Sequence, residues 1–302
     1  MLSRILVPLD GSSLAERTLP CARMLARGLG AELTLFRAIA LPPDFEEILS
    51  VVDLEPEKPL AQLAADADDY LCRVGSRLEE DGLCVQKVVQ LGRAAEAIVD
   101  YAEKVGIQLT VMATHGHSGV SRWRHGSVAE RVVQSASVPV LIVCSTESEG
   151  ITPHRPMACH RILVPLDGSS VAEQVLPTVT TVAQALDAEL VLLRVPIAQV
   201  SGSLMGEWCM PLEGTFDTAN HIAESYLERV AERLRADGVR VFTTTRMGAV
   251  ANVIIEYAEA NQIDLIAMCT HGRTGLARWA LGSVADRVLR ARCLPLLLVR
   301  AH

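Results

Sequence analysis

Short apolar runs alternate with amphipathic stretches along the whole chain. The run Ile5–Leu9 is continuously apolar, which is typical of a strand buried on both faces of a sheet. Apolar residues recur at helical spacing between about Leu60 and Glu80, and "CVQKVV" after them alternates as a strand does. With the runs "LTLFRAI", "LTVM" and "VPVLIV", five strands joined by helices predict a parallel, doubly wound α/β sheet.

The whole pattern occurs twice. Arg4–Ser13 is identical to Arg161–Ser170, which indicates two copies of one domain. We expect a first domain over residues 1–146, a second over 157–302, and an exposed, polar linker over 147–156.

Local signals predict where the first helices begin and end. Ser13 with Glu16, and Ser170 with Glu173, form the S-x-x-E pattern of a helix capping box. Gly30 is expected to end the first long helix, and the Pro-rich, acidic stretch 40–59 reads as an outer loop.

Composition narrows the function classes. The chain has 302 residues and a formal net charge of −8, which disfavours a nucleic-acid partner. No apolar run is long enough to cross a membrane, and the first residues lack the pattern of a signal peptide. The eight cysteines form no C-x-x-C pair, and His154, Cys159 and His160 fit no zinc spacing, so we expect thiols in a reducing, cytoplasmic location and no metal site.

The strongest chemical signal is "MATHGHSGVSRWRHGSVAERV" from Met112, which returns as "MCTHGRTGLARWALGSVADRV" from Met268. Each copy leads from a buried strand through Thr-His-Gly and nine residues to a Gly-Ser pair that opens a helix. A helix N-terminus beside glycine is suited to bind an anionic group. The alternative is that Ser127 with Glu130 only caps the helix.

Other polar residues keep two interpretations. Asp10 and Asp167 could bind a ribose or a phosphate-bound Mg²⁺, or simply favour the turn before glycine. For His115 and His271 we favour a turn histidine with a backbone hydrogen bond over a catalytic role, because no nucleophile stands beside them.

Basic residues in the same loop differ between the copies. Arg122, Arg124 and His125 could neutralise phosphate charge in the first copy, or belong to a solvated helix end. The second copy keeps only Arg278.

These motifs resemble the universal stress protein family in its tandem two-domain form. The resemblance covers nearly the whole chain and rests on "VPLDGS", on "THG" followed after nine residues by "GS", and on the final "VPVLIV" and "LPLLLV". It implies two Rossmann-like, doubly wound, parallel five-stranded sheets of strand order 3-2-1-4-5. It also implies a pseudo-dimer in which the copies pair through their last strands, with a homodimer as a further option.

The resemblance also implies an adenine-nucleotide site in each copy. Nucleotide-binding members carry Gly, two residues, Gly, nine residues, then Gly with Ser or Thr. Here the first glycine is replaced by Ala113 and by Cys269, and the bulkier Cys269 is the larger departure from the family pattern. The residues implied to contact nucleotide are Pro8, Asp10, Ala38, Met112, Ala113, Gly116, Gly126, Ser127, Val128, Pro165, Asp167, Val195, Met268, Cys269, Gly272, Gly282, Ser283 and Val284.

The implied function is a stress-response regulator that binds ATP, or ADP or AMP, with or without Mg²⁺ and without fast turnover. A slow ATPase or phosphotransferase is one alternative, although no G-x-x-x-x-G-K-[ST] motif occurs and neither Gly loop holds a lysine. A dimerisation or scaffold module with vestigial pockets is the other.

Overall fold

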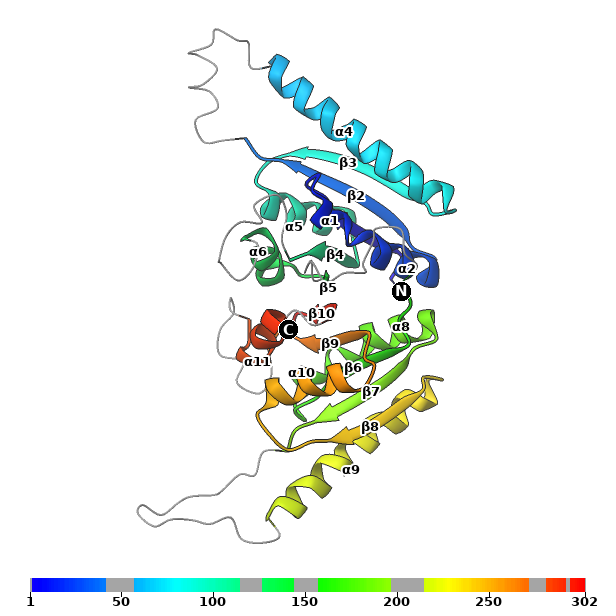
Figure 1. The fold of residues 1–302 in the computed structure, drawn as a ribbon, viewed down its shortest axis with the longest axis vertical. Helices are drawn as coiled ribbons and strands as arrows, with labels where there is room; N and C mark the ends of the chain where they lie inside the picture. Colours follow the sequence, from blue (N-terminus) through cyan, green and yellow to red (C-terminus); the bar gives the residue numbers. More distant parts are fainter. Residues whose placement is uncertain are drawn as a thin grey trace, which may run out of the picture. The chain divides into compact units, whose positions relative to one another are not determined.

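The computed structural model describes residues 2–41, 57–114, 127–143, 157–196, 215–271, 281–291 and 294–301. The chain forms two compact units (Figure 1). Unit 1 holds Met1–Ala158 with Pro295–Arg300, and unit 2 holds Cys159–Leu294 with Ala301–His302. The domain boundaries and linker expected from the sequence stay a prediction.

Unit 1 is a parallel sheet covered by helices. Its strands lie in the order β3-β2-β1-β4-β5, which confirms the order 3-2-1-4-5 expected for the first copy. The last strand of the chain, β10, belongs to this unit and runs antiparallel to β5. The elements are β1 Arg4–Pro8, α1 Ser13–Glu16, α2 Leu19–Leu29, β2 Glu32–Ile39, α4 Glu57–Glu80, β3 Val85–Leu91, α5 Ala94–Val105, β4 Leu109–Ala113, α6 Ser127–Ser135, β5 Val140–Val143 and β10 Leu296–Val299.

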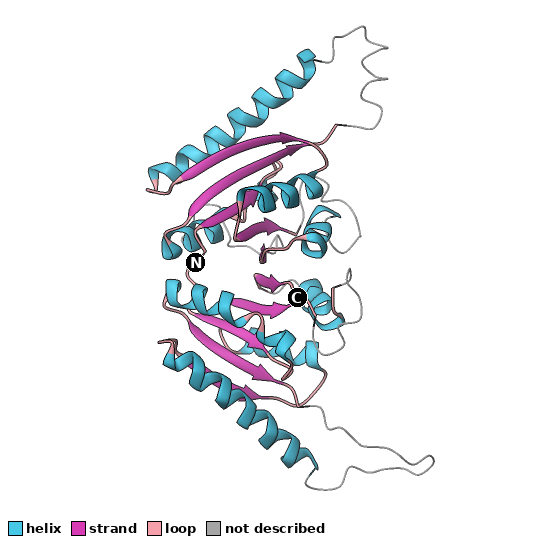
Figure 2. Cartoon of the chain, turned by 180° about the vertical axis from the view of Figure 1, so that it is seen from behind, coloured by secondary structure: helices cyan, strands magenta, loops and turns pink. Residues whose placement is uncertain are grey.

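Unit 2 repeats the same arrangement, with strands in the order β8-β7-β6-β9 and every neighbouring pair parallel. Figure 2 shows helices beside the strands of each unit. Its elements are β6 Arg161–Pro165, α7 Ser170–Glu173, α8 Leu176–Leu186, β7 Glu189–Arg194, α9 Thr215–Ala236, β8 Val241–Thr245, α10 Val250–Ala260, β9 Leu265–Cys269 and α11 Ser283–Ala291.

The winding of the chain places helices on both faces of each sheet. In unit 1, α4 packs on β3 and β2, whereas α5 packs beside α6. Right-handed crossovers put helices on opposite faces when the direction of winding reverses, which happens here between β3 and β4. The central strands are therefore covered on both sides, and all five residues of β4 are buried. This is why β1 and β4 read as continuous apolar runs.

The helix ends agree with the sequence at one point and differ at another. Gly30 ends α2 in the left-handed conformation at φ 62° and donates its N–H to the Ala26 carbonyl, as expected. The capping box expected at Ser13 is wrong: the N-cap of α1 is Ser12, whose Oγ accepts from the Ala15 N–H at 3.1 Å. The second copy shows the same shift, with Ser169 in place of Ser170.

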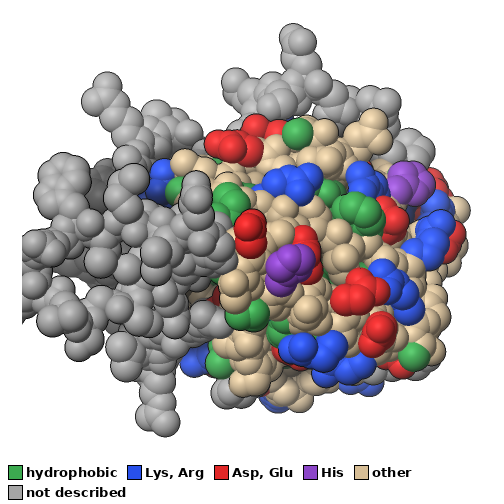
Figure 3. Space-filling view, turned by 90° about the horizontal axis from the view of Figure 1, so that it is seen from below, with side chains coloured by type: hydrophobic (Ala, Val, Ile, Leu, Met, Phe, Trp, Pro, Cys, Tyr) green, Lys and Arg blue, Asp and Glu red, His purple; other side chains and the backbone are tan. Residues whose placement is uncertain are grey.

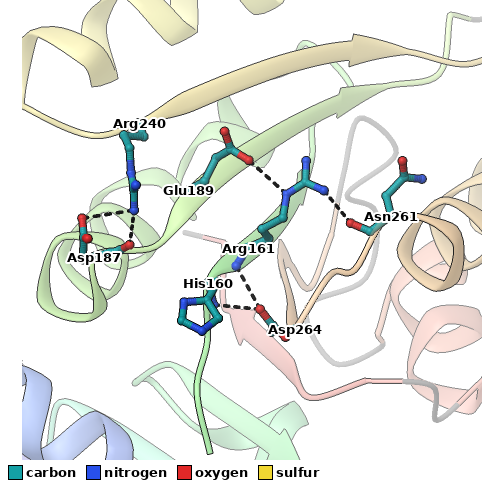
Figure 4. Close-up of polar contacts among 7 residues, drawn as sticks. All are labelled: His160, Arg161, Asp187, Glu189, Arg240, Asn261 and Asp264. Carbon is teal, nitrogen blue, oxygen red and sulfur yellow. Dashed lines mark hydrogen bonds and ion pairs between the residues drawn. The ribbon is translucent and has the colours of Figure 1, made fainter.

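Polar side chains tie together the amino-terminal ends of the strands in unit 2 (Figure 4). The Arg161 guanidinium pairs with Glu189 at 3.0 Å and donates to the Asn261 carbonyl at 2.6 Å. Asp264 accepts from the backbone N–H groups of His160 and Arg161 at 2.7 and 3.0 Å. These contacts join the starts of β6, β7 and β9, so this end of the sheet is closed by its own side chains.

Candidate functional site

The carboxyl ends of β1 and β4 meet where the strand order reverses. The two strands are parallel neighbours, with Ile5 beside Leu109 and Leu6 beside Thr110. Open α/β sheets bind ligands at this switch point because successive connections leave it toward opposite faces. The fold thus brings Pro8 and the Asp10 turn close to the end of β4, where the expected contact residues Met112 and Ala113 lie.

The Asp10 carboxylate organises the turn after β1. Its Oδ1 accepts from the Ser12 N–H at 2.9 Å and from the Ser12 Oγ at 2.6 Å, and Gly11 adopts a φ of 87°. Asp167 makes the same two bonds to Ser169 at the same distances. The duplicated carboxylate therefore fixes the serine that caps the following helix, which is why the cap lies one residue earlier than the S-x-x-E pattern suggested.

A cluster that the sequence analysis missed lies beside this turn. The Arg37 guanidinium, at the end of β2, stacks over the Tyr70 ring at 5.1 Å, and the Tyr70 hydroxyl donates to Glu16 at 3.1 Å. A Cβ on Gly11 would lie 3.4 Å from the guanidinium nitrogens. The arginine thus covers the glycine of the turn.

The second copy repeats the cluster. Arg194 stacks over Tyr226 at 4.6 Å, and the Tyr226 hydroxyl donates to Glu173 at 2.9 Å. Glu173 also pairs with Arg233 at 2.7 Å. Identical residue types at matching positions of both copies were the signal that could have revealed the cluster.

The buried tyrosines respond to the site's charge. Burial raises the pKa of Tyr70, Glu16 and Asp10 raise it further, and Arg37 opposes them. The same causes raise the pKa of Tyr226. Gly11, the residue after Asp10, lies against the Arg37 guanidinium, so the turn and the cluster form one polar group.

The end of β9 touches the start of α11 through a glycine. The Gly282 N–H donates to the Thr270 carbonyl at 2.8 Å, and a Cβ on Gly282 would lie 2.9 Å from that same oxygen. Only glycine fits this contact. The first N–H groups of a helix have no partner inside it, so those of Ser283 and Val284 open at the carboxyl edge of the sheet.

The other expected contact residues differ in their burial. Ala38, at the end of β2, and Val195, just after β7, are half-buried beside this edge, as are Pro165 and Val128. Met112 and Met268 are buried, and Ser127 is exposed at the start of α6. Gly116, Gly126 and Gly272 lie outside the described residues, as do His115, Arg122, Arg124, His125 and Arg278.

Two further observations concern groups that the sequence singled out. His271 Nδ1 lies 3.1 Å from the Thr270 hydroxyl, its neighbour in the chain. Within the described ranges no group of three His, Cys, Asp or Glu side chains could hold a metal ion. On the face drawn in Figure 3, acidic and basic side chains are interspersed. Ion pairs of unit 2 join Arg233 to Glu173 and Arg235 to Glu228.

The chain was compared with known proteins. A model of the universal stress protein family matches residues 1–143 and again 159–300. The chain belongs to the universal stress protein family. Universal stress protein Slr1230 of Synechocystis is 24% identical over 99% of this chain and 100% of its own length.

Other relatives agree. Universal stress protein MJ0531 of Methanocaldococcus jannaschii is 34% identical over 46% of this chain and 81% of its own length. The crystal structure of a universal stress protein from Archaeoglobus fulgidus covers 100% of this chain and 97% of its own, with a TM-score of 0.70 at 18% identity. The last comparison shows the shared fold. Across the described helices, none is both long and apolar enough to span a membrane.

Proposed function

We propose that this universal stress protein binds an adenine nucleotide, ATP or its ADP or AMP relatives, at the carboxyl ends of β1 and β4 and acts as a stress-response regulator without fast turnover. The observation that supports the proposal is the contact of Gly282 with Thr270 in the second copy, which brings the start of α11, where a helix offers its first N–H groups, to the carboxyl end of β9. The first copy has the same Gly-Ser-Val-Ala sequence at the start of α6.

Different residues around the switch point would contact different parts of the nucleotide. The Gly-Ser helix start would hold the phosphates, the β4 end would flank the ribose, and the Asp10 turn with Ala38 would meet the adenosine. Mg²⁺ would be held by the phosphate oxygens and water, which satisfy most of its coordination. No lysine lies in either Gly loop, which supports binding rather than rapid phosphoryl transfer.

The experiment is isothermal titration of the full chain with ATP and Mg²⁺, with phosphate release followed in parallel. We expect saturable heat that Gly126→Asp abolishes, because the new carboxylate occupies the phosphate position and repels it. Gly82→Asp is the charge control, because it adds the same charge at a turn where no atom lies within 4 Å. Since Gly82 has a φ of 81°, thermal unfolding first checks that this variant is folded. Absence of heat with the wild-type chain refutes nucleotide binding, and several turnovers per minute refute a regulator without turnover.

We also propose that the copies pair through their last strands and that the protein works in the cytoplasm. The antiparallel register of Leu296 with Ile142 and of Leu298 with Val140 supports the pairing. The five cysteines described are all free thiols, which supports a reducing compartment. Slow amide exchange in β10, matching that of β5, is expected, and rapid exchange in β10 alone would contradict the pairing. Sedimentation velocity tests for a homodimer.

A further inference from the structure

The two copies differ at the end of the strand that flanks the switch point. Ala113 ends β4 in the first copy, and Cys269 ends β9 in the second. The Cys269 Sγ lies 3.6 Å from the Ala172 carbonyl of α7, the helix that follows β6. The thiol therefore reaches from one strand bordering the switch point to the helix after the other, whereas the Ala113 methyl group is too short to do so.

A second exchange explains why the thiol lies there. In the first copy the Thr18 hydroxyl donates to the Ala15 carbonyl at 2.7 Å. In the second copy the position of Thr18 is taken by Val175, which has no hydroxyl, and Cys269 supplies the donor to the matching carbonyl. The Ala15 carbonyl also accepts from the Thr18 N–H at 3.1 Å, so the pairs Thr18 with Ala113, and Val175 with Cys269, are alternative sources of a side-chain donor to matching carbonyls.

The surroundings keep the thiol in place at neutral pH. Cys269 is 5% exposed, and burial raises its pKa to about 12, with a smaller rise from Asp167 against a lowering by the Val175 backbone. A protonated thiol remains a donor to Ala172. Ala172, whose carbonyl accepts from the thiol, donates its own N–H to the Ser169 Oγ at 3.1 Å, and the Ser169 hydroxyl donates to Asp167 at 2.6 Å, so the thiol contacts the turn expected to meet the adenosine.

We infer that the chain binds one nucleotide, in the first copy, and that Cys269 closes the ribose side of the matching crevice in the second copy. The inference rests on the proposed function, and it assigns Cys269 and Val175 as the residues that decide which copy binds. The Gly-Ser helix start is present in both copies, and Cys269 adds a difference at the sugar to the loop difference of Arg124 and His125 against Ala280 and Leu281. Binding in the second copy should be at least tenfold weaker than in the first.

Exchanging the pairs between copies tests the inference. Titration of the full chain with ATP and Mg²⁺ should give one equivalent for the wild type and two for Val175→Thr with Cys269→Ala. The matched exchange, Thr18→Val with Ala113→Cys, should abolish the high-affinity equivalent. Far-UV circular dichroism and thermal unfolding check that each variant folds.

Hydrogen exchange of the wild-type chain gives an answer that needs no variant. Saturating ATP should protect amides of α1 and β4 at least tenfold more than those of α7 and β9. Two equivalents of similar affinity in the wild type would overturn the inference while leaving the proposed function intact. A folded Val175→Thr, Cys269→Ala variant that still binds one equivalent would do the same. A wild type that binds none overturns both.

Discussion

Replacing Gly75 and Lys87 of the first copy by the alanine and threonine of the second copy tests how each long helix packs against its edge strand. Gly75 lies in α4, where a Cβ would approach the Lys87 Cε of β3 to 2.4 Å. Lys87 Nζ reaches Glu79 at 2.8 Å over the surface of that helix. In the second copy the matching residues are Ala231, fully buried in α9, and Thr243 on β8. The smaller helix residue, Gly75, is therefore found in the copy that has the longer strand side chain, Lys87.

The structure sets the expected size of the effect. Alanine is more favourable than glycine in a helix interior by about 1 kcal/mol. Gly75→Ala alone should gain little of this, because the new methyl group displaces the lysine stem. In a Lys87→Thr background the methyl group has room, and Gly75→Ala should stabilise the protein by about 1 kcal/mol. The two substitutions should therefore couple by about 1 kcal/mol.

The assay is urea unfolding of the two single variants and the double variant, followed by far-UV circular dichroism and fluorescence. Coincident transitions are needed before a free energy of unfolding is assigned. The reverse exchange is the control: Ala231→Gly should cost about 1–2 kcal/mol, from helix propensity and the lost buried methyl group. Additivity within about 0.3 kcal/mol, or a full gain from Gly75→Ala alone, would refute the steric argument.

Three further outcomes are expected. Ser12→Ala should lower the free energy of unfolding, measured by heat or urea, by about 1 kcal/mol because it removes the N-cap. Ser13→Ala should change it by less than about 0.5 kcal/mol, and equal effects of the two variants would contradict Ser12 as the N-cap. Gly282→Ala should cost about 1–3 kcal/mol, because a methyl group and the strand carbonyl cannot share the space and the hydrogen bond is lost; an unchanged unfolding midpoint contradicts the contact. The raised pKa of Tyr70 and Tyr226 means that their contribution to stability is present below about pH 10, where an unfolded tyrosine ionises, and is lost as pH rises above it. With Tyr70→Phe and Tyr226→Phe together, the melting temperature should fall less steeply above pH 10 than it does in the wild type. A fall as steep as that of the wild type would exclude the two tyrosines as its cause.

Much of the architecture is readable from the chain. The duplicated "RILVPLDGSS" segment and the apolar runs predict two copies of a parallel sheet, because strands buried on both faces need uninterrupted apolar residues. The resemblance of the Gly-Ser motifs to one family supplies the strand order, which β1 to β5 confirm. Gly30 ends its helix as expected, since a left-handed terminus has a local sequence signature.

Tertiary structure decided the partners of polar groups. Even the local turn after β1 differs from the S-x-x-E pattern, which pointed to Ser13, because the Asp10 carboxylate holds Ser12 in the capping position. The stacking of Arg37 on Tyr70 joins a strand end to a helix beyond the next loop. The Cys269 thiol points to the Ala172 carbonyl of α7, whereas the matching Ala15 carbonyl of α1 accepts from the Thr18 hydroxyl. Periodicity and local motifs report which face a residue takes and where a helix ends, whereas the partner of a polar group is fixed only when distant segments are packed together.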